Sequence, residues 1–215
     1  MNPSLAYRTV RRVGQTLCWV ALLGVVSGAM SGCGAAEAPS LAAGTALDRD
    51  PQLIVDDSVA PDFEALATET WEQFLEAFRG RSECFGDVLL RAERSLDSRA
   101  AYDPDTATVT VRVPGSPAML KSALVHEWAH HVEFQCDEHQ ALRRDFLLAQ
   151  GLPPDTPWRS DEELVERPTD EWAEMPSEQY AEATIVVVLG VRHIPTSARV
   201  TTEGVRVIEA WARGD

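Results

Sequence analysis

The chain is short of positive charge, and it lacks an internal repeat and a glycine-rich nucleotide-binding loop. Its 215 residues carry 19 Lys and Arg against 34 Asp and Glu, a formal net charge of −15 at pH 7. Nucleic acids and anionic lipid surfaces attract basic patches, so this balance argues against nucleic acid as a partner and against electrostatic docking on a membrane. It favours cationic peptides only weakly, and solubility alone explains it better.

The chain also lacks a hydrophobic run long enough to cross a membrane. Residues 16–30 are apolar, but they are too few and too rich in Gly and Ser for a bilayer span. Three arginines and no acidic residue precede them: Arg8, Arg11 and Arg12. This pattern is typical of an export signal. The run Met30-Ser31-Gly32-Cys33 resembles the lipobox of bacterial lipoproteins, in which cleavage leaves the cysteine at the new N-terminus to receive lipid.

We therefore expect a lipoprotein signal peptide over residues 1–32, a lipid on Cys33, and a protein exported to the outer face of the bacterial cell membrane and anchored there. A simple secretory signal with an incidental Cys33 is one alternative. The Arg11-Arg12 pair also admits a twin-arginine signal, although its flanks fit poorly. Residues 33–52, rich in Ala, Gly and Ser, predict a flexible tether, and residues 53–215 suit one domain with one core.

Cysteine is scarce, and none of the four forms a C-x-x-C pair. Cys18 leaves with the signal peptide and Cys33 would carry lipid, so Cys84 and Cys136 remain as an even pair in an oxidising compartment. We expect a disulfide between them, which would close a loop of about 52 residues and contribute up to about 4 kcal/mol by chain entropy. Zinc ligation by these two thiols is the alternative.

Hydrophobic periodicity predicts an α+β domain with a small antiparallel sheet. The expected helices cover residues 61–79, 118–136, 137–150, 178–189 and 202–213. The expected strands cover residues 87–94 and 100–113, the second folded into a hairpin at 103–106. Residues 184–188 are β-branched, so a strand stays an alternative there. Residues 152–176, rich in Pro and acid, predict a loop that lines a cleft with Trp158 and Trp172.

The strongest functional signal is His126-Glu127-Trp128-Ala129-His130, an H-E-x-x-H run inside an expected helix that Ser116-Pro117 begins. Residues four apart share a helix face, so the imidazoles of His126 and His130 can bind one metal ion. Glu127 lies about 100° round the helix, where a general base can take a proton from a metal-bound water. His131 points away from the ion and is expected at the surface or behind a ligand. The alternative for the whole motif is a solvated helix face.

A catalytic zinc needs three protein ligands and an open position, and the segment Pro176 to Ala183 offers Glu178 and Glu182. A helix begun at Pro176 leaves Glu174 outside it on a loop. The two motifs together resemble the gluzincin type of metallopeptidase, and the Glu-x-x-Ala-Glu-Ala string is most similar to its lethal-factor-like branch. The resemblance implies a zincin-like domain in which Glu178 is the third zinc ligand and Glu182 supports a ligand histidine. An ordinary acidic stripe is the alternative.

One departure from the resembled branch concerns the oxyanion. That branch carries a tyrosine shortly before the ligand glutamate, whereas this chain has residues 169–173 without one. A working peptidase still needs a donor for the developing negative charge. We expect His193 to supply it, with an ordinary loop histidine as the alternative.

The sequence thus predicts a lipid-anchored, monomeric zinc metallopeptidase that cleaves a peptide or protein substrate outside the cytoplasm. One alternative is a zinc-binding envelope lipoprotein without catalysis. Another is a zinc amidohydrolase that acts on an amide of the cell envelope.

Overall fold

The computed structural model of the chain describes residues 50–159 and 169–215. The predicted signal peptide, Cys33 and almost all of the predicted tether lie outside the described residues. At the start of the described part Pro51 is buried, and its carbonyl accepts a hydrogen bond of 3.2 Å from Trp71 Nε1. Packing therefore begins within the last residues of the predicted tether.

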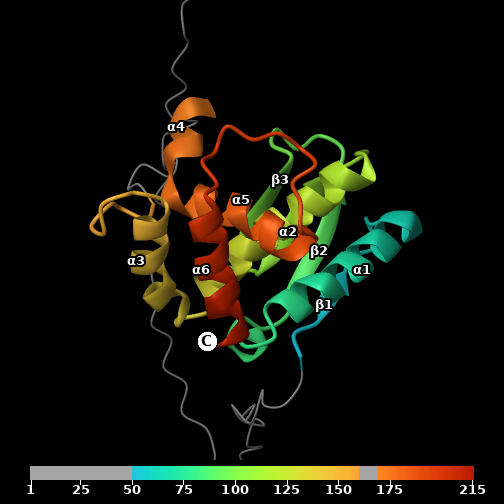
Figure 1. Cartoon of the computed structure of the whole chain (residues 1–215). Coiled ribbons are helices and arrows are strands. Elements are labelled where there is room, and N and C mark those ends of the chain that lie inside the picture. The colour runs from blue at the N-terminus through green and yellow to red at the C-terminus, as the bar shows by residue number, and fades with distance from the viewer. Residues whose placement is uncertain (1–49, 160–168) are drawn as a thin grey trace, which may run out of the picture. The chain divides into compact units, whose positions relative to one another are not determined.

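The fold is α+β, built on one four-stranded mixed sheet (Figure 1). The strands are β1 (Leu53–Val55), β2 (Val88–Glu93), β3 (Ala100–Asp103) and β4 (Thr108–Arg112), in the spatial order β1-β2-β4-β3. The hairpin of β3 and β4 is antiparallel, as predicted. The β1–β2 and β2–β4 pairs are parallel, so the prediction of an antiparallel sheet is wrong. Parallel pairs join distant segments without a tight turn, and no local turn pattern marks them.

One face of the sheet is apolar and the other is charged. Leu90 lies opposite Val109 and Ala92 opposite Val111, so these four buried side chains share a face. The exposed face carries Arg91, Glu93 and Arg112. All helical packing on the sheet therefore falls on a single face, and a core between sheet and helices follows from the alternation.

Six α-helices are described: α1 (Pro61–Ala77), α2 (Pro117–Gln135), α3 (His139–Ala149), α4 (Thr169–Glu174), α5 (Pro176–Leu189) and α6 (Thr202–Arg213). Five of them fall where the sequence predicts helices, and residues 184–188 belong to α5 rather than to a strand. The sixth, α4, occupies part of the predicted loop, so Glu174 ends a short helix instead of lying on a loop. Within the described ranges, none of the helices has the length and apolar character that spanning a membrane requires.

Helix α2 lies at the centre of the domain, between β3 and β4 on one side and α5 on the other (Figure 1). Its start is set locally, because Ser116 Oγ accepts a hydrogen bond of 3.3 Å from Met119 N and Pro117 occupies the first turn. Leu124, Trp128 and Val132 are fully buried. The position of α2 between two layers explains why both its apolar stripe and its histidine face are covered.

The burial of His131 corrects the prediction of a surface or ligand-supporting residue. Its side chain is fully buried on the sheet side of α2. His131 Nε2 lies 3.2 Å from the Gly86 carbonyl, which can only accept, so Nε2 donates and Nδ1 accepts from Tyr102 Oη at 2.9 Å. Burial lowers the pKa of His131. The residue is a neutral link between α2 and the sheet edge.

The predicted disulfide between Cys84 and Cys136 is confirmed. It joins the 3-10 turn η1 (Ser82–Cys84) to the end of α2, and it excludes zinc ligation by these thiols. Beside it, a Cβ on Gly80 would lie 2.2 Å from the carbonyl carbon of Arg213, so glycine lets the chain after α1 pass against the end of α6. The disulfide fixes the C-terminal end of α2, and the Gly80 contact fixes the end of α1 against α6.

Candidate metal centre

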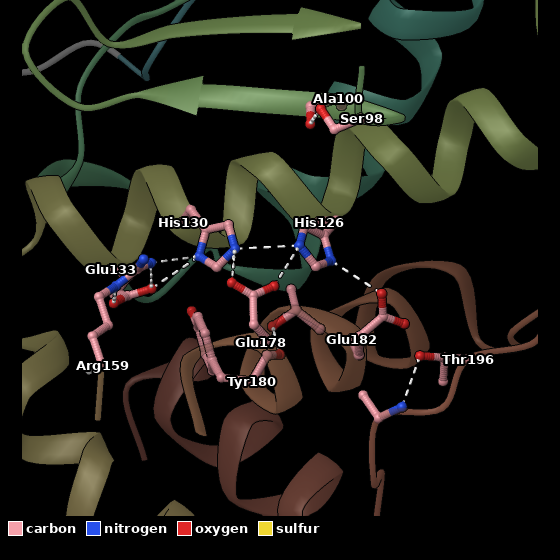
Figure 2. Close-up of polar contacts among 12 residues, drawn as sticks. Ser98, Ala100, His126, His130, Glu133, Arg159, Glu178, Tyr180, Glu182 and Thr196 are labelled. Atoms are coloured by element: carbon pink, nitrogen blue, oxygen red, sulfur yellow. Dashed lines mark hydrogen bonds and ion pairs between the residues drawn. The ribbon is translucent and has the colours of Figure 1, made fainter. Parts of the chain in front are cut away.

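Three side chains converge between α2 and α5: His126, His130 and Glu178 (Figure 2). The Nε2 atoms of the two histidines are 3.2 Å apart. Glu178 Oε2 lies 3.1 Å from His126 Nε2, and Glu178 Oε1 lies 3.5 Å from His130 Nε2. The sequence predicted this set, and the packing of α5 against α2 brings its members together.

The spacing of these atoms fits a first-row metal ion. Zinc binds histidine nitrogen and carboxylate oxygen at about 2.0–2.2 Å, so two ligands at a tetrahedral angle lie about 3.3 Å apart. The Nε2–Nε2 separation of 3.2 Å and the contacts of 3.1 and 3.5 Å to Glu178 are close to this value, with a different Glu178 oxygen facing each histidine. Two imidazoles and a carboxylate are also the ligand types that zinc uses in catalytic sites. The residues present therefore fit zinc.

Carboxylates behind each histidine set which ring nitrogen faces the ligand cluster. His126 Nδ1 lies 3.1 Å from Glu182 Oε1, and His130 Nδ1 lies 2.9 Å from Glu133 Oε2. An ionised carboxylate can only accept, so each Nδ1 donates, and each Nε2 is the nitrogen that can bind a metal once it has lost its proton. The sequence predicted this support from Glu182, and Figure 2 shows the two carboxylates at opposite ends of the cluster.

Sequence reasoning missed the role of Glu133. This buried carboxylate accepts hydrogen bonds from Arg159 Nε at 2.6 Å, Arg159 Nη2 at 2.7 Å and Trp158 Nε1 at 2.8 Å. Its position three residues after His130, on the same helix face, was an available signal. The contacts from Trp158 and Arg159, which come from a distant loop, had no such signal. Together they hold Glu133 against His130.

The charges around the ligands favour a bound cation. Burial opposes protonation of His130, but Glu178 and Glu133 outweigh it and raise the pKa of His130 to about 9. Burial also opposes ionisation of Glu178, yet His130 and His126 hold the pKa of Glu178 well below its ordinary value. Protons on the histidines thus balance the carboxylates when no metal is bound, and a divalent cation can replace them.

Glu127 lies beside the ligands rather than among them. It is 7% exposed, and it lines the same cavity as His126, His130 and Glu178. Burial raises the pKa of Glu127, while the two histidines act in the opposite direction. A carboxylate of raised pKa that faces a cavity next to a candidate metal site is suited to exchange protons with a substrate or water.

The cavity has a volume of about 1160 Å³. Trp172 of α4 lies on its wall and stacks on the His126 ring, with centroids 5.9 Å apart and planes 20° apart. The loop after α5 contributes Arg192, whose Nη1 forms an ion pair with Glu182 Oε2. This loop was predicted to supply His193. Instead His193 is exposed and is not among the residues that line the cavity, because its neighbour Arg192 is the residue turned inward.

No protein-family model matches the chain, and neither a curated protein nor a solved structure matches it. Any function must therefore be argued from the arrangement of the side chains.

Proposed function

We propose that the protein is a zinc metallopeptidase that hydrolyses peptide bonds in its cavity. The observation that carries the proposal is the convergence of His126, His130 and Glu178 beside the buried carboxylate of Glu127 on one cavity wall. The first three match the ligands of a catalytic zinc, which takes three protein ligands and leaves one position open. The cavity volume of about 1160 Å³ leaves room for several residues of a peptide.

Each residue has a distinct role in this proposal. Zinc would supply a Lewis acid for the scissile carbonyl and a water of lowered pKa. Glu127 would take a proton in the cavity and return it to the leaving amine, a task that its raised pKa favours. Glu182 and Glu133 would hold His126 and His130 in the tautomer that leaves Nε2 free to bind the metal.

The same arrangement supports a zincin-like assignment of gluzincin type. In that assignment the helix with both histidines is α2, and the glutamate ligand comes from a second helix, α5. Glu178 lies in the first turn of α5 and Glu182 one turn later, which is the order that the resemblance to the lethal-factor-like branch implies. The contact of Glu178 with His126 Nε2 and the contact of Glu182 with His126 Nδ1 support this assignment.

Substitution of Glu127 by Gln tests the mechanism. We expect Glu127→Gln to keep about one zinc per chain and to lose hydrolysis of a mixed peptide library, because only the proton carrier is removed. Glu64→Gln, at an exposed position of α1, is the matched control and should leave hydrolysis unchanged. Full activity in Glu127→Gln would refute the mechanism. A wild-type protein that binds zinc but cleaves no peptide would favour a binding role or an envelope amide as substrate.

We also propose that the protein works outside the cytoplasm, attached to the membrane by a lipid on Cys33. The support is the arginine-rich start, the short apolar run and the lipobox-like Met30 to Cys33. Expression of Cys33→Ala in a bacterial host should move the protein from the membrane fraction to the soluble fraction, whereas Cys18→Ala should not. Unchanged partitioning of Cys33→Ala would contradict the lipid anchor.

A further inference from the structure

In the part of this strongly acidic chain that the structure describes, three arginines line the cavity: Arg99, Arg159 and Arg192. Arg159 lies at the His130 end, where both its contacting nitrogens bind the Glu133 carboxylate. Arg192 lies at the other end, where it pairs with Glu182 behind His126. The two ends of the cavity therefore differ, because only the His126 end has Arg99 as a second arginine.

Arg192 lines the cavity and is held in place by Glu182. Its side chain is 13% exposed, and Nη1 is engaged by Glu182. Its Nε is buried and has no hydrogen-bond partner among the residues that the structure describes. Burial and then the positive charge of Arg99 lower the pKa of Arg192 to about 10. Arg192 already has Glu182 as its counter-ion, so the charge that a bound anion would compensate is that of Arg99.

Arg99 supplies the exposed half of this pair. It precedes β3 at the cavity rim, next to the tight contact in which Ser98 Oγ donates to the Ala100 carbonyl at 2.6 Å (Figure 2). Its side chain is exposed, and no carboxylate within residues 50–159 and 169–215 forms an ion pair with it. Arg99 can therefore turn toward a ligand, whereas Arg159 and Arg192 already hold glutamates.

We propose that Arg99 and Arg192 form a carboxylate subsite at the His126 end of the cavity, which makes the protein selective for peptides with a carboxylate close to the scissile bond. This inference rests on the proposed peptidase function and adds the substrate class. Two guanidinium groups that face one cavity match a carboxylate, since each can donate to its oxygens. Glu182 links Arg192 to His126, so the subsite adjoins the reacting centre.

The carboxylate can come from an acidic side chain or from a peptide C-terminus, and matched peptides separate the two. One pair is amidated at the C-terminus and differs by Glu or Gln at a single position. A third peptide has Gln there and a free C-terminal carboxylate. Dissociation constants are measured on the zinc-loaded, full-length Glu127→Gln variant, and kcat/KM on the wild type. If the Glu peptide binds about tenfold more tightly than the Gln peptide, the subsite binds an acidic side chain. If the peptide with the free C-terminus shows that advantage instead, the subsite binds a terminal carboxylate.

Variants at the rim make the assignment specific. Arg99→Ala should reduce the preference to below about twofold, while Arg94→Ala, an exposed arginine that does not line the cavity, should preserve it. Asp97 also lines the rim, so Asp97→Asn should increase the preference. Equal binding of all three peptides, or a preference that survives Arg99→Ala, would overturn the subsite. If the carboxylate peptide binds selectively but the wild type cleaves nothing, the subsite stands and the peptidase proposal fails.

Discussion

Replacing each of Glu174, Glu178 and Glu182 by Gln distinguishes a metal ligand from a carboxylate that holds a ligand histidine and from a residue without a role in metal binding. The three residues recur every four positions but face different neighbours. Glu178 has one carboxylate oxygen 3.1 Å from His126 Nε2 and the other 3.5 Å from His130 Nε2. Glu182 contacts His126 Nδ1, behind the ring, at 3.1 Å. Glu174 is exposed at the end of α4. The structure therefore predicts three different losses of zinc affinity.

A carboxylate that supports a metal-bound histidine contributes about 10 to 100-fold to metal affinity. Glu182→Gln should therefore weaken zinc binding by that factor, which is about 1.4 to 2.7 kcal/mol. Glu178→Gln removes a charged ligand and should cost more than about 100-fold. Glu174→Gln should stay within about twofold, because its side chain faces solvent. Competition against a chromophoric chelator at one pH measures all three, with circular dichroism to verify folding.

The ranking decides between specific errors. A larger loss in Glu182→Gln than in Glu178→Gln would mean that the ligand assignment is displaced by one turn of α5. Three variants that all match the wild type would mean that this cluster binds no zinc.

Two further predictions concern stability. Burial lowers the pKa of His139 to about 3. Below about pH 6.5 the unfolded chain therefore binds a proton at His139 that the folded chain does not bind. The free energy of unfolding consequently falls as the pH drops from about 6.5 toward about 3. At pH 5 the loss is about 2 kcal/mol from this residue, and urea unfolding of His139→Gln should lack that part of the slope; an unchanged slope would contradict it. Replacing both Cys84 and Cys136 by Ala should lower the free energy of unfolding by about 4 kcal/mol, and two free thiols in the exported native protein would refute the disulfide.

The sequence predicted what local rules determine. Ser116 and Pro117 mark the start of α2, and Pro176 marks the start of α5. The sequence therefore sufficed to assign His126 and His130 to one helix and Glu178 to a second helix. Three-residue β1 is too short to show a period, and its parallel pairing with β2 leaves no trace in neighbouring residues. The sheet was therefore predicted with the wrong strand direction.

Side-chain errors at the site have the same origin. His131 was expected to be outside because its own helix places it away from His130, but β3 and the Gly86 carbonyl cover that side. His193 was expected to supply the oxyanion donor, whereas His193 is exposed and its neighbour Arg192 lines the cavity. Glu133 gains its role from Arg159, 26 residues later. The environment of each of these side chains depends on contacts between distant segments of the chain. The periodicity of a single helix does not predict such contacts.

The charge balance of the site explains why it contains arginines at all. Four carboxylates surround the cluster, from Glu127, Glu133, Glu178 and Glu182, and buried charges are tolerated only when they are compensated. Arg159 neutralises the support behind His130, and Arg192 neutralises the support behind His126. Glu178 then remains as the carboxylate that the histidines keep ionised, whereas burial raises the pKa of Glu127. The compensation couples the hold on each histidine to an arginine from a loop, so loss of either arginine would leave a buried carboxylate uncompensated behind a histidine.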